Sequence, residues 1–119
     1  MFVYLGADNS RSHDIARAAA PGQTVLLPCN LPDTITKHWR YHRRTHVHNI
    51  THNGIVAERL AGRFQLDSEG LLIKDVQTTD QGTYTCFGHH HHHQHHHARR
   101  IRLFVPCELA TSLRSMKVE

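Results

Sequence analysis

The 119-residue sequence predicts an all-β domain built as an antiparallel sandwich of two sheets. Short segments of alternating apolar and polar residues recur between turn signals, and no helical period competes with them. Two cysteines, Cys29 and Cys86, flank the single tryptophan, Trp39. A domain of about 100 residues buries little apolar surface, so a disulfide with a bulky ring packed against it would contribute roughly 4 kcal/mol of stability. Two buried free thiols are the alternative interpretation.

The N-terminal half holds two clear strands. Residues 1–20 mix polar residues with alanines and predict an edge segment that ends at a Pro-Gly turn. Alternation over residues 25–29 predicts a strand with Cys29 on its buried face. Residues 37–44 form the next strand, and the two-residue period places Tyr41 on the same inward face as the tryptophan.

The C-terminal half has a weak region followed by regular strands. Residues 45–61 are rich in His, Asn and Gly, and only Ile55-Val56 indicates a short strand there. The later strands are expected at residues 63–68, 71–74, 81–87 and 101–105, and Pro106 ends the last one. Seven to nine short strands joined by turns favour an antiparallel sandwich over a parallel sheet.

Several motifs together resemble a variable-type domain of the immunoglobulin superfamily. They are Gly-Gln-Thr-Val-Leu-Leu-Pro-Cys at 22–29, Trp39, Gly-Arg-Phe at 62–64, Gly-Leu-Leu-Ile-Lys-Asp-Val at 70–76, and Asp-Gln-Gly-Thr-Tyr-Thr-Cys at 80–86. The resemblance runs from about residue 22 to residue 105. We therefore expect an edge segment at 1–20, a variable-like domain at 21–106 with a His-rich loop at 88–98, and a tail or linker at 107–119.

The resemblance implies roles for particular residues. Cys29 and Cys86 are expected to form the disulfide, with Trp39 and Tyr84 in the core around it. An ion pair between Arg63 and Asp80 is expected to close one end of the sandwich. The interval from Trp39 to Arg63 is short, so an intermediate-type domain is the alternative. The joining-segment bulge typical of antibody chains is missing after Cys86, which favours a receptor or adhesion domain.

A histidine tract between the last two predicted strands is the most unusual segment. It holds His89, His90, His91, His92, His93, His95, His96 and His97. Neutral imidazole suits zinc, nickel and copper, but a tract without fixed geometry predicts adventitious binding and no resident cofactor. A functionally neutral low-complexity loop and contact with a partner or polyanion are the other interpretations.

Basic residues on the third and last strands predict a positive face. The candidate binding residues are Tyr41, Arg43, Arg44, Arg99, Arg100 and Arg102, and Arg40, His42, His46 and His48 lie among them in the sequence. In a sandwich of this type the two strands belong to one sheet, so their outward residues share a face. An acidic protein or an acidic glycan would suit it, and ordinary solvated charge is the alternative. No aromatic stacking platform interleaves with the arginines, so nucleic acid is not expected.

Two single residues carry further hypotheses. Asn49-Ile50-Thr51 is an acceptor triplet for N-glycosylation. Cys107, the odd cysteine, could form an interchain disulfide in a homodimer, pair with a region outside this sequence, or stay a free thiol.

Catalysis finds little support in the sequence. It has no glycine-framed nucleophile, phosphate-binding loop or His-Glu-x-x-His motif. A disulfide requires an oxidising compartment, so we expect an extracellular or cell-surface protein whose signal peptide and any anchor lie outside this sequence, and no run is long enough to insert into a membrane. We therefore predict a non-enzymatic recognition module of immune-receptor or adhesion type. A metal- or pH-responsive module acting through the histidine tract is the alternative.

Overall fold

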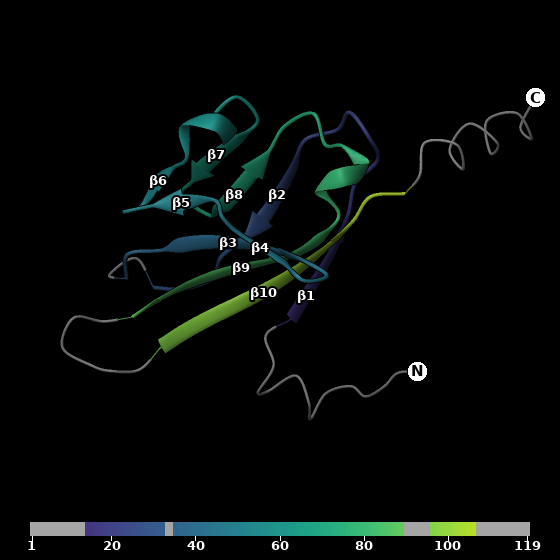
Figure 1. Cartoon of the computed structure of the whole chain (residues 1–119). Helices are drawn as coiled ribbons and strands as arrows, with labels where there is room; N and C mark the ends of the chain where they lie inside the picture. The colour runs from purple at the N-terminus through teal and green to yellow at the C-terminus, as the bar shows by residue number, and fades with distance from the viewer. Residues whose placement is uncertain (1–13, 33–34, 90–95, 107–119) are drawn as a thin grey trace, which may run out of the picture.

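The computed structural model of the chain describes residues 14–32, 35–89 and 96–106. These residues form β-strands arranged as two packed sheets, with two short 3-10 helices in the connections (Figure 1). The elements are β1 (Asp14–Ala18), β2 (Val25–Pro28), β3 (His38–Arg43), β4 (His46–Asn49), β5 (Thr51–His52), β6 (Ile55–Val56), η1 (Glu58–Leu60), β7 (Phe64–Asp67), β8 (Gly70–Ile73), η2 (Thr78–Asp80), β9 (Gly82–His89) and β10 (His96–Phe104).

The larger sheet has the order β1-β10-β9-β3-β4. Its long strands β10, β9 and β3 pair antiparallel, whereas β1 runs parallel to β10 at the edge. Register places Trp39 opposite Cys86 on the neighbouring strand, and Ile101 opposite Tyr84. The two-residue period therefore gathers the largest inward side chains into one layer.

The smaller sheet has the order β2-β8-β7 and packs against this layer. Leu27 and Leu71 lie opposite each other in it and are fully buried. The largest fully buried side chains of the core are Trp39, Tyr84, Leu27, Ile50, Leu71, Ile73, Ile101, Val76 and Cys86. Burying such apolar surface between two sheets is the main favourable contribution to folding.

A disulfide joins the two layers. Cys29 follows the end of β2, and its Cα atom lies 5.9 Å from that of Cys86 on β9. Trp39 occupies the register position beside Cys86 on β3 (1% exposed). The predicted all-β sandwich and the predicted disulfide are both confirmed.

The structure also differs from the predictions in detail. It has ten strands among the described residues where seven to nine were expected. The hairpin ladder pairs His96 with His89, so residues at both ends of the predicted 88–98 loop belong to strands. Asp14–Ala18, within the segment expected only as an edge, is an ordered edge strand. The domain boundary at residue 21 remains a prediction.

Gly82 shows why the Asp-x-Gly-x-Tyr-x-Cys motif needs its glycine. Its φ of 156° is rarely adopted by side-chain-bearing residues. A Cβ atom there would lie 2.7 Å from the carbonyl oxygen of His42 and 2.7 Å from a ring carbon of Tyr41. The missing side chain therefore lets β9 approach β3 closely at the start of their pairing.

Candidate recognition face

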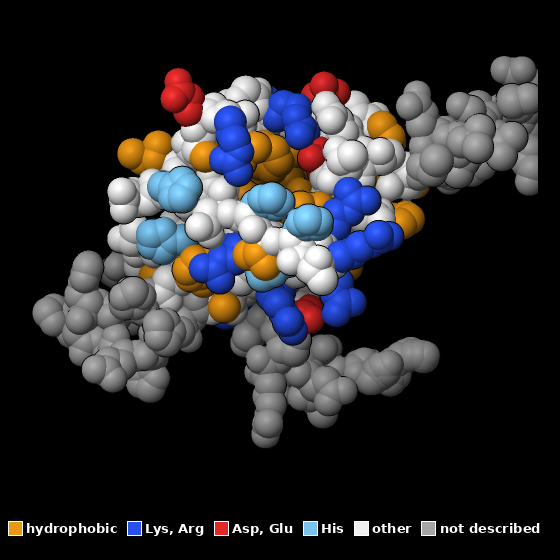
Figure 2. Space-filling view, viewed as in Figure 1, with side chains coloured by type: hydrophobic (Ala, Val, Ile, Leu, Met, Phe, Trp, Pro, Cys, Tyr) orange, Lys and Arg blue, Asp and Glu red, His pale blue; other side chains and the backbone are white. Residues whose placement is uncertain are grey.

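The outward face of the larger sheet brings together Arg100 and Arg102, two of the predicted binding residues, with Arg40 and His42. Register aligns Arg40 on β3 with Thr85 on β9 and Arg100 on β10, and it aligns Arg102 with Thr83 and His42. Figure 2 shows Arg, Lys and His side chains over the strands of the larger sheet and further basic side chains near β7 and η1. We call the outward side chains of these strands the basic face, which comprises His38, Arg40, His42, Phe87, Arg100 and Arg102.

Aromatic contacts hold one end of the basic face in place. The guanidinium carbon of Arg40 lies 4.6 Å from the ring centroid of Phe87, within the range of a cation–π interaction. The ring of His38 lies 5.5 Å from the same ring, and Arg40 Nε donates a 3.3 Å hydrogen bond to Asn49 Oδ1. These contacts restrict the rotamers of Arg40, so less entropy is lost when it binds a partner.

One carboxylate partly offsets the positive charge of the basic face. Arg100 donates to Asp14 through Nε at 3.0 Å and through Nη2 at 3.3 Å. Arg102 lies 3.9 Å from the same carboxylate and is 71% exposed. These are solvent-exposed pairs of little energetic weight. They leave three guanidinium groups against one carboxylate among the described outward residues of this sheet.

Four of the predicted binding residues lie elsewhere. The hydroxyl of Tyr41 donates to the carbonyl oxygens of Gln81 at 2.7 Å and Thr79 at 3.1 Å, so this side chain lies on the inward side of the sheet. Arg99 sits opposite Cys86 and has the inward register of β10. The remaining two, Arg43 and Arg44, lie at the β3–β4 turn, beyond the centre of the basic face.

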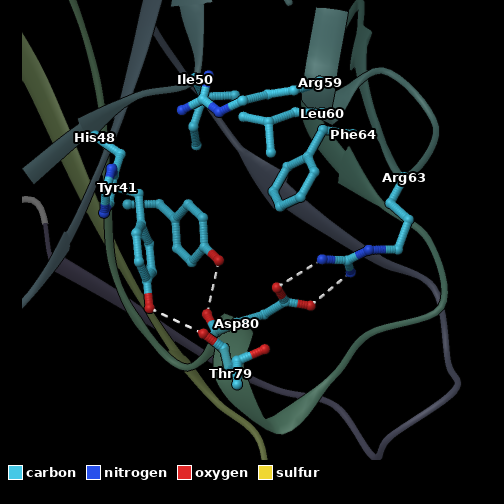
Figure 3. Close-up of a pocket in the computed structure, with 10 residues that line it drawn as sticks. Tyr41, His48, Ile50, Arg59, Leu60, Arg63, Phe64, Thr79 and Asp80 are labelled. Carbon is cyan, nitrogen blue, oxygen red and sulfur yellow. Dashed lines mark hydrogen bonds and ion pairs between the residues drawn. The ribbon is translucent and has the colours of Figure 1, made fainter. Parts of the chain in front are cut away.

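The end of the sandwich next to the β3–β4 turn is closed by the predicted ion pair. Arg63 donates to Asp80 through Nη1 at 2.7 Å and through Nη2 at 3.0 Å (Figure 3). The backbone N–H of Gln77 donates to the same carboxylate at 2.8 Å. The hydrogen bonds that Arg63 donates to Asp80 raise the pKa of the Arg63 guanidinium, so Arg63 keeps its positive charge. Such a pair fixes local geometry more than it adds net stability.

Two tyrosines beside this ion pair remain neutral. Burial raises the pKa of Tyr84, with the nearby Asp80 carboxylate acting in the same direction. Burial also raises the pKa of Tyr41, although Arg43 opposes this. Neither phenol can supply a negative charge or a nucleophile near neutral pH.

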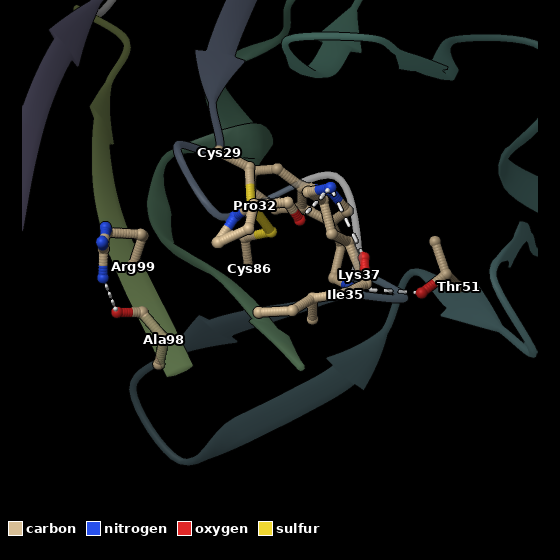
Figure 4. Close-up of a disulfide and its surroundings, with 9 residues drawn as sticks. Cys29, Pro32, Ile35, Lys37, Thr51, Cys86, Ala98 and Arg99 are labelled. Carbon is tan, nitrogen blue, oxygen red and sulfur yellow. Dashed lines mark hydrogen bonds between the residues drawn. A yellow bond between two sulfur atoms is a disulfide. The ribbon is translucent and has the colours of Figure 1, made fainter. Parts of the chain in front are cut away.

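The acceptor triplet lies on β4 and just beyond it. Asn49 is exposed on the same face as Arg40, whereas Thr51 is 5% exposed and its Oγ1 accepts a 3.0 Å hydrogen bond from the backbone N–H of Trp39. Figure 4 draws Thr51 in one view with the disulfide, and Ile35 and Lys37 lie between the two in that view. A glycan on Asn49 would therefore project over the basic face.

The predicted metal ligands fall mostly outside the described residues. Residues 90–95 are not among them, and His89, His96 and His97 are described only as strand residues. No group of three or more metal-ligating side chains occurs in the described parts of the chain. Cys107 and the tail at 107–119 also lie outside the described residues. Within residues 14–32, 35–89 and 96–106, no helix has the length and apolar character needed to cross a bilayer.

Some residues of the basic face were not among the predicted binding residues. His38 and Phe87 become neighbours only when β3 pairs with β9, so their contact could not be read from either strand alone. The two-residue period could have separated Arg99 from Arg100, because Arg99 has the parity of the inward Ile101. That signal was present in the sequence.

Comparisons with known proteins agree with this architecture. Residues 14–106 match the family model described as the immunoglobulin V-set domain. No curated protein matches the sequence significantly.

Solved structures with the same fold include single domains and multidomain fragments. The second Ig domain of the mouse polymeric immunoglobulin receptor has a TM-score of 0.65 at 15% identity, covering 79% of this chain and 97% of that one. The N-terminal four Ig domains of Dscam1 isoform 6.9 give a TM-score of 0.62 at 19% identity, covering 82% of this chain and 23% of that one. The N-terminal eight Ig domains of Down Syndrome Cell Adhesion Molecule isoform 1.30.30 give a TM-score of 0.61 at 20% identity, covering 81% of this chain and 12% of that one. The chain thus spans less than a quarter of the Dscam structures, and these likenesses show a shared fold.

Proposed function

Because the chain belongs to the immunoglobulin V-set family, we propose that it is a non-enzymatic, extracellular recognition module that binds an acidic protein partner through its basic face. The single observation that carries this proposal is the composition of that face. Three arginines and two histidines surround Phe87 on it, and Asp14 on the neighbouring strand is the one carboxylate among the described outward residues of the sheet.

That composition is typical of a protein interface. Arginine and aromatic residues are enriched at interface centres, whereas lysine, aspartate and glutamate are depleted there. Phe87 with Arg40 stacked on it forms a rigid anchor, and the exposed Phe104 and Val47 add apolar area at either side. An acidic partner would be steered by the charge and held by these anchors.

The disulfide and the similar folds support the extracellular, recognition part of the proposal. A disulfide linking the two sheets persists in an oxidising compartment. Two of the similar structures come from a receptor and a cell adhesion molecule. We infer the same broad class of work here, on a cell surface or in secretion.

A binding screen tests the proposal. The chain is prepared as a tetramer and passed over an immobilised library of extracellular protein domains. It is also passed over an array of sulfated and sialylated glycans. We expect a protein hit whose association rate falls as salt is raised, because exposed charges are screened. The variant Arg40→Glu/Arg102→Glu should lose at least about tenfold in affinity for it.

The matched control reverses the same number of charges away from the basic face. Arg17→Glu/Lys74→Glu changes two exposed basic residues on β1 and after β8 and should leave the affinity unchanged. Equal losses in both variants would show that only net charge matters. Binding confined to glycans, or no ligand at all, would overturn the protein-recognition proposal, and salt-sensitive self-association in sedimentation would replace it with homotypic assembly.

A further inference from the structure

A pocket opens between the two sheets at an edge that the proposed function does not use. β4 ends at Asn49, and the chain then forms the separate β5–β6 ladder instead of adding a strand to the larger sheet. The space between β4 and β7 is left as a pocket of about 240 Å³. Figure 3 shows its lining, which comprises Tyr41, His48, Ile50, Arg59, Leu60, Arg63, Phe64, Thr79, Asp80 and Tyr84.

The floor of the pocket is apolar and aromatic. Ile50, Phe64 and Tyr84 are almost fully buried, and the rings of Tyr41 and Tyr84 lie 4.8 Å apart. The ring of Phe64 points into the pocket from β7 in Figure 3. The volume is below the range of about 300–1,000 Å³ typical of drug-sized ligands, so it suits a group with a single ring.

The polar groups of the floor are already used within the protein. Tyr84 donates to the carbonyl oxygen of Asp80 at 2.6 Å, and Tyr41 donates to that of Gln81. The Asp80 carboxylate is neutralised by the bidentate Arg63. A ligand therefore meets no unpaired negative charge among the described residues of the floor. The guanidinium carbon of Arg63 lies over one face of the Phe64 ring, 5.2 Å from the ring centroid.

The rim differs, because its cation has no partner among the residues that the structure describes. Arg59 on η1 makes no ion pair or hydrogen bond with any residue that the structure describes. Its side chain crosses the top of the pocket in Figure 3, over Ile50. His48 forms the opposite wall and stacks on Tyr41, with ring centroids 6.2 Å apart. The mouth thus offers N–H donors and positive charge above an apolar floor.

From this arrangement we propose that the pocket binds a small aromatic carboxylate. The ring lies on Phe64 and the two tyrosines, and the carboxylate accepts hydrogen bonds from Arg59 at the rim. The guanidinium fork matches a carboxylate in geometry and charge. A cationic ring compound is disfavoured, because Arg59 and Arg63 repel it.

Nuclear magnetic resonance titration of the full chain tests this site. Phenylacetate should give saturable shifts of the amides of Ile50, Leu60 and Phe64, with a dissociation constant of about 1 mM for so small a ligand. Acetate, which lacks the ring, and benzylamine, which reverses the charge, should give no saturable shifts at the same amides.

Three variants separate the site from non-specific charge. Arg59→Gln should weaken phenylacetate binding at least about fivefold, because one charge-assisted hydrogen bond is lost. Leu60→Phe should fill the pocket and abolish binding. Arg17→Gln, an exposed arginine on β1, should change nothing. The proposal is overturned if benzylamine binds as well as phenylacetate, if Arg59→Gln binds like the unmodified chain, or if no probe gives saturable shifts.

Discussion

The hydroxyl of Tyr84 donates a 2.6 Å hydrogen bond to the backbone carbonyl oxygen of Asp80, four residues upstream in the chain. This bond ties the start of β9 to η2, and Tyr84 is 1% exposed. The carboxylate of the same Asp80 accepts both bonds from Arg63. One residue thus links β7, η2 and β9 at the closed end of the sandwich.

Removing the Tyr84 hydroxyl should destabilise the domain. Tyr84→Phe keeps the ring but leaves the Asp80 carbonyl oxygen without this donor, at a cost of about 1–3 kcal/mol in the free energy of unfolding. Urea unfolding followed by tryptophan fluorescence measures it. Tyr41→Phe is the control, because the Tyr41 hydroxyl is only half-buried and water can replace its bonds. Equal losses in the two variants would contradict the special role of the Tyr84 bond.

Stability should fall at alkaline pH. The pKa values of Tyr41 and Tyr84 are raised above 10.0 in the folded chain, mainly by burial. Above that pH the unfolded chain releases these protons first, so unfolding becomes more favourable, by about 1.4 kcal/mol per pH unit for each tyrosine. Below pH 10.0 the folded and the unfolded chain both keep these tyrosine protons, so the stability of the folded chain does not depend on them.

Urea unfolding in a pH series with the disulfide intact checks this slope. Tyr84→Phe removes one of the two titrating groups and should flatten the slope between about pH 10 and about pH 11. A free energy of unfolding that stays constant through this range would contradict the prediction.

Breaking the ion pair from the acidic side should also destabilise the domain. Asp80→Asn removes the charge that neutralises Arg63 and should cost about 2 kcal/mol, because the carboxylate is almost fully buried. A double-mutant cycle with Arg63→Met isolates the coupling between the two side chains. If the effects of the two substitutions are additive, the coupling energy is zero and the ion pair contributes no stability of its own.

A glycan on Asn49 should block the basic face. Asn49 shares that face with Arg40, so an attached glycan would cover the side chains that the proposed partner contacts. Expression in a glycosylating host, with mass spectrometry for occupancy, should give weaker partner binding than the Asn49→Gln chain. Thr51→Ala is an unsuitable control because Thr51 accepts the Trp39 N–H in the core. Equal binding by the two forms would contradict the prediction.

Local periodicity and family motifs were enough to predict the central strands and the closed end of the sandwich. Alternation over 25–29 and 101–105 found strands whose inward residues are the core, because each strand has one buried face. The ion pair between Arg63 and Asp80 was expected from the motifs alone. These features depend on residues whose positions the pattern determines directly.

Other features depend on pairing between distant strands. Two alanines and one arginine, which have little preference for strands, make up most of β1. This strand forms through its pairing with β10. The pocket beneath Arg59 exists because β4 stops early and the chain leaves the sheet, which no local pattern in the His- and Asn-rich residues 45–61 indicates. Arg59 was therefore not among the predicted site residues.

The parallel pairing of β1 with β10 determines how the domain responds to mechanical tension. Asp14 pairs at Arg100 and Ala18 at Phe104, so the outer ends of the two strands lie at opposite ends of their shared ladder. A force that pulls Asp14 away from Phe104 acts along the strands, and all the rungs of the ladder bear the load at once instead of peeling apart one by one. A pull on these two strand ends would therefore meet its greatest resistance at the edge strand.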